Sequence, residues 1–247
     1  MKILMLDIET APNIVATWGM FRVNIGTDNI IETGHTICYA ARWYDSSKTE
    51  YKSIYHHSEE EMVEALWLLL DEADVVVHYN GTKFDIPTLN KEFVRLGYVP
   101  PSTYHQIDLL KVVRKQFRFT SNKLDYICQE LDIGSKMQHK GILLWVGCMN
   151  NDAKDWKVMK EYNIKDIDLL EELYEELLPW ITNHPNRALW LDDVSEPTCK
   201  NCGSTNVKAN GVERTKTQQY QRYKCNDCGA NLRSRKLLKK ADEGVLV

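Results

Sequence analysis

The chain has 247 residues, 43% of them apolar and 27% charged, which is enough to bury one full core and leave a remainder the size of a small module. This composition excludes fibrous, disordered and disulfide-stapled classes. The net charge of −4 argues, as an average, against a protein that binds nucleic acid. Its distribution argues otherwise, because residues 198–240 contain eleven Lys and Arg against two acids, whereas residues 1–197 carry a net charge of −11.

Cysteine usage and hydropathy predict an intracellular protein. Four of the seven cysteines fall between residues 199 and 228, and the other three are scattered, which is typical of a reducing compartment. The N-terminal apolar run ends at Asp7, too early for a signal-peptide core, and no apolar run approaches the ~20 residues of a membrane span. We therefore expect a soluble, cytoplasmic protein with no membrane partner.

Apolar runs predict four strands, at residues 3–8, 35–44, 50–55 and 74–79. The polar turn 45–48 between the second and the third is typical of a hairpin. Residues 10–34 contain glycines, a proline and polar clusters, and are predicted to form a long connection. Two aromatic residues in it, Trp18 and Phe21, either pack locally, which we favour, or stack on bases.

Helical periodicity accounts for most of the remaining chain up to Pro179. Ser58 and Glu61 have the spacing of a capping box, for a helix that ends near Asp71. Further helices are predicted at 86–96, 108–118, 121–131 and from the cap Asp152 to Pro179. The alternation of strands and helices predicts a mixed α/β sheet.

The domain organisation follows from a change in composition near the C-terminus. Residues 183–197 are polar and contain two prolines, as expected of a linker. We predict a first domain at 1–182, this linker, a second domain at 198–240 and a tail at 241–247.

Acidic residues mark the end of the first strand. Asp7 and Glu9 lie two residues apart, so their side chains leave the same face of the sheet. Paired carboxylates buried without compensation would shift their pKa values or destabilise the fold, whereas one or two Mg²⁺ ions let both stay ionised. These two residues therefore predict a metal site.

Two further acids are candidates for the same site. Asp85 follows the turn after the strand at 74–79, and loops at strand ends commonly carry chemistry. Asp166 shares a helical face with Tyr162, four residues earlier. Each acid taken alone is most often a cap or a solvated charge, so their combination is what carries the prediction.

Three motifs in this order resemble those of the DEDD superfamily of 3′→5′ exonucleases, which has a ribonuclease H-like fold. They are Asp7-Ile-Glu-Thr10, Asn80-Gly-Thr-Lys-Phe-Asp85 and Tyr162-Asn-Ile-Lys-Asp166. Tyr-x-x-x-Asp is the spacing of the tyrosine subgroup, since the histidine version would need His at the position of Glu161. That subgroup looks like the proofreading exonuclease domains of family A and family B polymerases. The resemblance covers roughly residues 1–180 and implies a mixed five-stranded sheet flanked by helices.

The resemblance implies a role for each motif residue. Asp7, Glu9, Asp85 and Asp166 would ligate two Mg²⁺ or Mn²⁺ ions, and Tyr162 would position the attacking water. Two such ions can bind the scissile phosphate, activate a water and stabilise the leaving oxygen.

Other residues near the motifs receive weaker assignments. We expect Thr10, through its backbone, and Asn80 to contact the terminal nucleotide. Asp168 lies on a different helical face from Asp166 and is predicted to be a solvated charge, and Asp108 is predicted to cap a helix. A polymerase would need hundreds more residues, so we expect the domain to act alone or with a separate DNA polymerase or a replication or repair protein.

Two Cys-x-x-Cys-Gly knuckles define the second domain. They are Cys199-Lys-Asn-Cys202-Gly and Cys225-Asn-Asp-Cys228-Gly, with twenty-two residues between them, a spacing suited to one tetrahedral Zn²⁺. A redox motif would explain only one pair, and the compartment disfavours disulfides. A segment of this size cannot bury enough surface to fold unaided, so the zinc is predicted to be structural.

The segment resembles zinc ribbons of transposases and transcription factors. Residues 218–224 alternate in a strand pattern that sets Tyr220 and Arg222 apart from their neighbours, and we predict that both contact substrate. Basic side chains release counterions from phosphates, which favours nucleic acid over protein as the partner of the ribbon.

The sequence thus predicts a two-metal 3′→5′ exonuclease that releases nucleoside monophosphates from single-stranded DNA, with a zinc ribbon that helps to bind the strand. Two alternatives stay open. One is an exoribonuclease that trims RNA, because the chemistry does not require a deoxyribose. The other is a non-catalytic module that docks to a polymerase or to nucleic acid through the ribbon.

Overall fold

The computed structural model describes residues 1–242 and residue 244, and it divides into two compact units. The first is Lys2–Leu173, and the second begins at Tyr174 and also includes Met1. Of the tail predicted at 241–247, positions 243 and 245–247 lie outside the described residues. No helix within the described part of the chain is long and apolar enough to cross a membrane.

The first unit is built on a five-stranded sheet of order β5-β4-β1-β6-β7. Its strands are β1 (Ile3–Thr10), β4 (Thr36–Trp43), β5 (Thr49–Ser53), β6 (Val75–His78) and β7 (His105–Asp108). The central strand β1 is antiparallel to β4, with Asp7 opposite Ala40, and parallel to β6, with Leu4 opposite Val76. The predicted mixed five-stranded sheet and its β4–β5 hairpin are confirmed.

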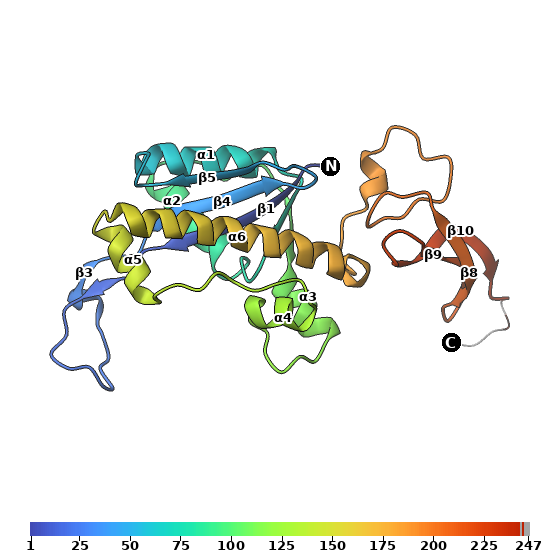
Figure 1. Cartoon of the computed structure of the whole chain (residues 1–247). Coiled ribbons are helices and arrows are strands. Elements are labelled where there is room, and N and C mark those ends of the chain that lie inside the picture. Colours follow the sequence, from blue (N-terminus) through green and yellow to red (C-terminus); the bar gives the residue numbers. More distant parts are fainter. Residues whose placement is uncertain (243, 245–247) are drawn as a thin grey trace. The chain divides into compact units, whose positions relative to one another are not determined.

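Helices cover both faces of this sheet (Figure 1). They are α1 (Glu59–Glu72), α2 (Asp85–Arg95), α3 (Leu109–Gln116), α4 (Leu124–Glu130), α5 (Ile142–Met149) and α6 (Ala153–Leu177). Leu4, Leu6 and Ile8 of β1 pack against α1 and α2, whereas α5 and α6 pack against Ala11 and Cys38. Because both faces are covered, β1 and β6 can be apolar along most of their length.

Side-chain caps begin three of the helices where the sequence predicts. The hydroxyl of Ser58 accepts a hydrogen bond from the backbone of Glu61, whose carboxylate accepts one from the backbone of Ser58, which confirms the capping box. Asp152 Oδ1 accepts from the backbone N–H of Lys154 at 2.8 Å, before α6. Asp108 accepts from the backbone of Leu110 at 3.1 Å, and so caps α3 as predicted.

The connection at residues 10–34 contains a small sheet of its own. Strands β2 (Ile14–Val15) and β3 (Ile30–Glu32) are antiparallel, and the 3₁₀ helix η1 (Thr27–Asn29) precedes β3. The segment between β2 and β3 projects away from the main sheet (Figure 1). In it Trp18 is fully exposed and Phe21 is 87% exposed, so the local packing that we favoured for these rings is wrong.

The second unit holds the 3₁₀ helices η2 (Leu178–Trp180) and η3 (Arg187–Trp190) and a three-stranded antiparallel sheet of order β10-β9-β8. Its strands are β8 (Val207–Arg214), β9 (Gln218–Cys225) and β10 (Asn231–Lys240). The amide of Asn201 donates to the carbonyl of Leu178 at 2.7 Å, which holds the first cysteine knuckle against the chain after α6. The core of this small sheet is Cys199, Cys225 and Ala230.

Candidate active site

Three acids from two elements meet where β1 leaves the core. Residues 3–6 of β1 are buried, and Asp7 and Glu9 follow on one face of the strand. Carboxylate oxygens of Asp7, Glu9 and Asp166 all lie within 4.8 Å of one another. Asp85 begins α2, and its Oδ1 accepts a hydrogen bond of 3.3 Å from the backbone N–H of Ile8. The structure therefore brings three of the four motif carboxylates within 4.8 Å of one another, and it holds the fourth, Asp85, against the backbone of β1 between Asp7 and Glu9.

Helix α6 supplies the remaining motif residues. Tyr162 and Asp166 lie one turn apart on it, and both are buried. Asn163, next to Tyr162, is fully buried, and its amide donates a hydrogen bond of 2.6 Å to Asp7 Oδ2. The site is thus formed by one face of the central strand and one face of the long helix.

Burial and mutual repulsion raise the pKa values of these acids. Burial, followed by the charges of Glu9 and Asp166, raises the pKa of Asp7 well above its ordinary value. Burial raises the pKa of Glu9 to about 7 and that of Asp85 to about 6. Such a cluster holds a full set of negative charges only when a cation is close to it.

An unsatisfied oxygen points to the same need. Asp166 Oδ1 is buried and has no hydrogen-bond partner within the described chain. Buried polar atoms are nearly always paired, so this one lacks a partner that a ligand can supply. An oxygen-only set of carboxylates fits the preference of Mg²⁺ and Mn²⁺ for hard ligands.

Lys136 is a member of the site that sequence reasoning missed. Its ammonium donates to Asp166 Oδ2 at 2.5 Å and to the hydroxyl of Tyr162 at 3.0 Å. Burial alone would lower the pKa of Lys136, but the charge of Asp166 outweighs it and raises that pKa, so the ammonium stays protonated. One ammonium balances only one of the four carboxylates.

Trp145 of α5 was missed as well. Its indole N–H donates to Glu9 Oε2 at 3.2 Å. The ring of His139 makes edge contacts with Trp145 and Tyr162, at centroid distances of 5.2 and 4.9 Å. Glu9 therefore has one oxygen oriented by the indole, and His139 packs the indole against Tyr162.

The other predicted residues are placed as follows. Thr10 ends β1, and Asn80 lies in the turn after β6, with its backbone N–H donating to Asp108 at 2.9 Å. Their contacts with a nucleotide stay a prediction. Asp168 is not a free solvated charge, as the sequence led us to expect, because it forms an ion pair of 2.5 Å with Arg42.

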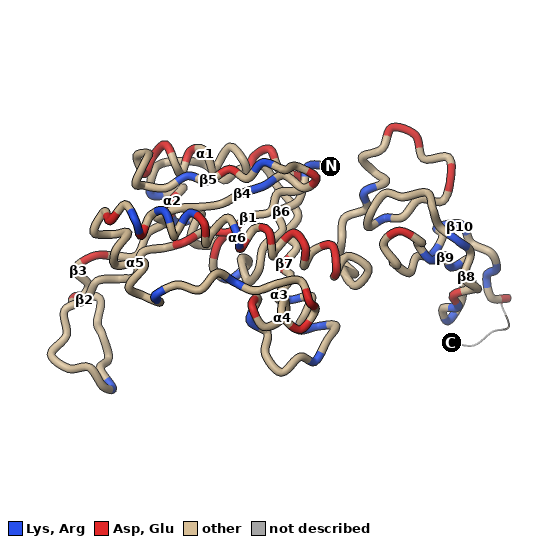
Figure 2. The backbone as a smooth tube through the Cα atoms, in the orientation of Figure 1, with Lys and Arg blue, Asp and Glu red and all other residues tan. Residues whose placement is uncertain are grey.

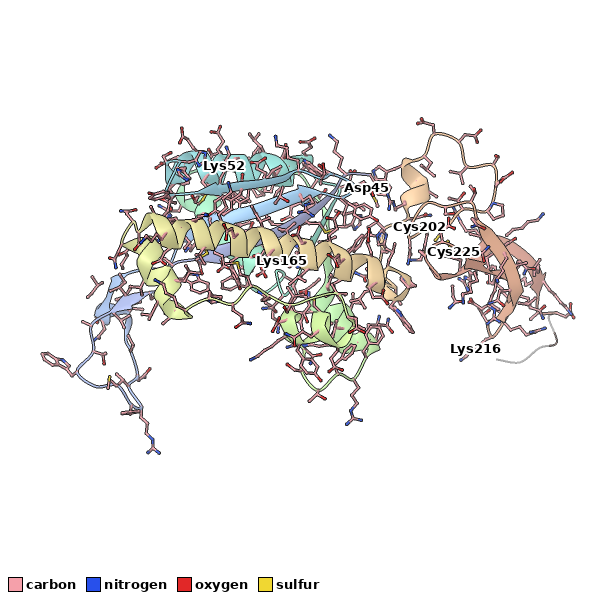
Figure 3. All side chains as sticks on the ribbon, viewed as in Figure 1. Asp45, Lys52, Lys165, Cys202, Lys216 and Cys225 are labelled. Carbon is pink, nitrogen blue, oxygen red and sulfur yellow. The ribbon has the colours of Figure 1, made fainter. Side chains whose placement is uncertain are left out.

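The four cysteines of the second unit form one cluster. Their sulfurs lie within 4.8 Å of one another, with 3.6 Å from Cys199 to Cys228 and 3.6 Å from Cys202 to Cys225, the pair labelled in Figure 3. These distances are far longer than a disulfide bond of about 2.05 Å. Four thiolates at about 2.3 Å from one tetrahedral zinc would be roughly 3.8 Å apart, so the cluster fits such an ion.

The ribonuclease H-like fold and its acidic cluster define a nuclease-type protein. A model of the RNase_H superfamily matches residues 4–178, so the chain belongs to that superfamily. Among solved structures, it is similar to the family B DNA polymerase from the hyperthermophilic archaeon Pyrobaculum calidifontis, with a TM-score of 0.56 and 18% identity. The match covers 72% of this chain and 24% of the polymerase chain, so this protein spans about a quarter of that length. No curated protein matches the sequence.

Proposed function

We propose that the chain is a 3′→5′ exonuclease that releases nucleoside monophosphates from single-stranded DNA and uses two Mg²⁺ or Mn²⁺ ions. The observation that carries the proposal is the meeting of Asp7, Glu9 and Asp166 within 4.8 Å, with Tyr162 one turn from Asp166 on the same helix. The raised pKa values of Glu9 and Asp85 support it, because they mark carboxylates that a cation would stabilise.

The metals and the chain's own residues have separate tasks. Asp7, Glu9, Asp85 and Asp166 would hold two divalent ions, which would supply the positive charge to bind the scissile phosphate, activate the attacking water and stabilise the leaving 3′-oxygen. Asn163 and Trp145 fix the orientation of Asp7 and Glu9 through one hydrogen bond each. Burial raises the pKa of Tyr162, so its hydroxyl keeps its proton. Because this hydroxyl accepts a hydrogen bond from Lys136, its own proton is directed away from the lysine. We infer that it orients the attacking water.

The ribbon is proposed to add affinity for the strand. Its four cysteines would hold one structural zinc, and residues 198–240 carry eleven of the basic residues. Neutralising phosphates with lysine and arginine gives binding that tolerates any sequence and weakens as salt is added.

Digestion of a 5′-labelled single strand tests this function. We expect a ladder that shortens from the 3′ end, that requires added Mg²⁺ or Mn²⁺, and that stops when these ions are withheld. Single-stranded DNA, duplex DNA and RNA are digested in parallel, which separates the proposal from an exoribonuclease. The absence of any metal-dependent shortening of DNA or RNA would overturn it.

A further inference from the structure

Strand alternation divides the basic residues of the ribbon between two faces of its sheet. In the central strand β9, Cys225 faces the cysteine cluster, and Tyr223 lies on the same face. Arg222 and Lys224 alternate with them and are exposed on the other face. Figure 2 shows lysines and arginines along β8, β9 and β10.

The register pairs these cations with further cations. Lys224 is opposite Lys208 of β8, and Arg222 is opposite Arg233 of β10. Directly opposed residues lie on the same face, so four exposed basic side chains form one patch, which we call the basic face (Lys208, Arg222, Lys224 and Arg233). Like charges directly opposite each other destabilise a sheet unless an anion lies between them.

The chain compensates this patch only in part. Glu213 forms an ion pair of 2.7 Å with Arg233. In the described chain, neither Lys208, Arg222 nor Lys224 forms an ion pair with a carboxylate. A negatively charged ligand would therefore relieve repulsion that the fold leaves in place.

Tyr220 lies on this face, and both its ring and its hydroxyl have a partner within the ribbon. The guanidinium of Arg233 covers the ring at 4.5 Å from its centroid, and the hydroxyl donates to the side chain of Gln218. The ring thereby holds Arg233 in the patch. The contact with substrate that the sequence predicts for Tyr220 stays a prediction.

We propose that the basic face binds the phosphodiester backbone of a single nucleic-acid strand. The opposite face is excluded because Val207, Leu232 and the cysteines pack together there. The ligand class follows from the arrangement of the cations in two adjacent cross-strand pairs. Phosphates repeat along a nucleic-acid strand, so one strand can contact both pairs. One small anion cannot contact both pairs. The inference rests on the proposed function of the chain as a nuclease that acts on such a strand.

The test compares two variants of the full-length, zinc-loaded chain that lose the same charge. One removes the basic face, K208Q/R222Q/K224Q/R233Q. The matched control removes four exposed cations elsewhere in the ribbon, R214Q/K216Q/K236Q/K239Q. Of these, Lys216 lies in the turn between β8 and β9, away from the labelled cysteines in Figure 3. Zinc stoichiometry and circular dichroism verify that both variants fold.

Binding of fluorescein-labelled oligothymidine and oligouridine with phosphorothioate 3′ ends is measured by anisotropy over a range of salt. For the basic-face variant we expect the affinity to fall at least about tenfold. The slope of log K against log salt concentration should become shallower by about 3, because each of the four phosphate contacts with a single strand contributes about 0.7 to that slope. Both oligomers should lose affinity equally, because the contacts are to phosphate. An unchanged affinity would overturn the proposal and favour a protein as the partner of the ribbon. An equal loss of affinity in the control variant, or a loss for only one of the two oligomers, would also overturn it.

A small substrate separates this inference from the proposed function. Hydrolysis of the p-nitrophenyl ester of thymidine 5′-monophosphate requires the acidic site and no strand. We expect both ribbon variants to hydrolyse it at the wild-type rate. If the wild-type chain hydrolyses neither this ester nor a labelled strand, the proposed function fails, while the binding comparison still decides the basic face.

Discussion

Asn163 donates a hydrogen bond of 2.6 Å to Asp7 across 156 positions of sequence, and so joins the long helix α6 to the central strand β1 at the candidate site. Both residues are confined: Asn163 is fully buried, and burial raises the pKa of Asp7. An amide N–H stabilises the ionised form of the carboxylate that it contacts. The bond therefore sets the orientation of the acid at the centre of the cluster.

Replacing Asn163 by alanine should lower the rate of strand shortening about ten- to a hundredfold, because groups that orient a metal ligand commonly have effects of this size. We also expect the Mg²⁺ concentration needed for half-maximal rate to rise. Lys165→Ala on the same helix, labelled in Figure 3, is the control. A wild-type metal requirement in Asn163→Ala would contradict this role.

Asp7→Asn and Asp166→Asn should each lower the rate at least about a thousandfold, because several kcal/mol of transition-state stabilisation depends on the metals that these residues are proposed to hold. Asp168→Asn should remain near the wild-type rate, since Asp168 pairs with Arg42 outside the cluster. Single-turnover digestion of a labelled strand measures all three. Near-normal rates in both Asp7→Asn and Asp166→Asn would refute the site.

Lys136→Gln should destabilise the metal-free protein by about 3 kcal/mol, because it leaves Asp166 without its buried partner. Mg²⁺ should restore part of the loss, since the ion supplies the missing positive charge. Calorimetry with and without Mg²⁺ measures both effects. A loss that Mg²⁺ leaves unchanged would show that Lys136 does not compensate a metal site.

The metal-free protein should become less stable as the pH rises. Folding raises the pKa of Glu9 from 4.5 to about 7 and that of Asp85 from 3.8 to about 6, mainly by burial. Between these values the folded state binds more protons than the unfolded state, so the free energy of unfolding falls with pH and the stabilisation is lost above about 7. Thermal unfolding at about pH 6.5 and about pH 8 measures this trend, because the lowered pKa values of the buried His78 and His184 have little effect on stability over this range. A rising Tm over this range would contradict the burial of the cluster.

Removing zinc should unfold the ribbon and leave the first unit folded. Structural zinc supplies about 10–16 kcal/mol in small domains, which a sheet with so small a core cannot replace. We expect Cys225→Ser to lose its zinc and to become sensitive to protease beyond residue 198, while Cys128→Ala keeps one zinc per chain. Hydrolysis of the small ester should persist in Cys225→Ser. Full zinc occupancy in Cys225→Ser would refute the four-cysteine site.

Much of the fold could be predicted because its elements carry strong local patterns. The apolar run of β1, the capping box of α1 and the cap of α6 are all visible in short windows of sequence. Strand β7 is not visible in this way, because it has four residues and its one apolar residue is the buried Ile107. It becomes a strand by pairing with β6, a contact that a local pattern does not encode. Helix α5 is almost wholly apolar and so lacks the polar face that would reveal its period.

The candidate site could likewise be predicted only in part from the sequence. The carboxylates could be predicted because a strand and a helix place residues two and four positions apart on one face. Lys136 lies outside helices and strands, and its contact with Asp166 spans 30 positions. Trp145 reaches Glu9 across 136 positions. Residues that tertiary structure brings to the site have no fixed sequence spacing from the motif residues. Lys136 and Trp145 could therefore not be predicted from the sequence.

The distance along the chain between Asp7 and Asn163 also governs when the site forms during synthesis. A nascent chain that has reached residue 152 contains β1, β6 and α2, and hence Asp7, Glu9 and Asp85. It lacks all of α6, and therefore Tyr162, Asn163 and Asp166. Domains form their cores as the chain emerges, but this acidic cluster is completed only by the last helix of its unit. A ribosome that stalls before α6 would release a fragment with no assembled site, so the proposed nuclease activity belongs only to chains that have been translated through that helix.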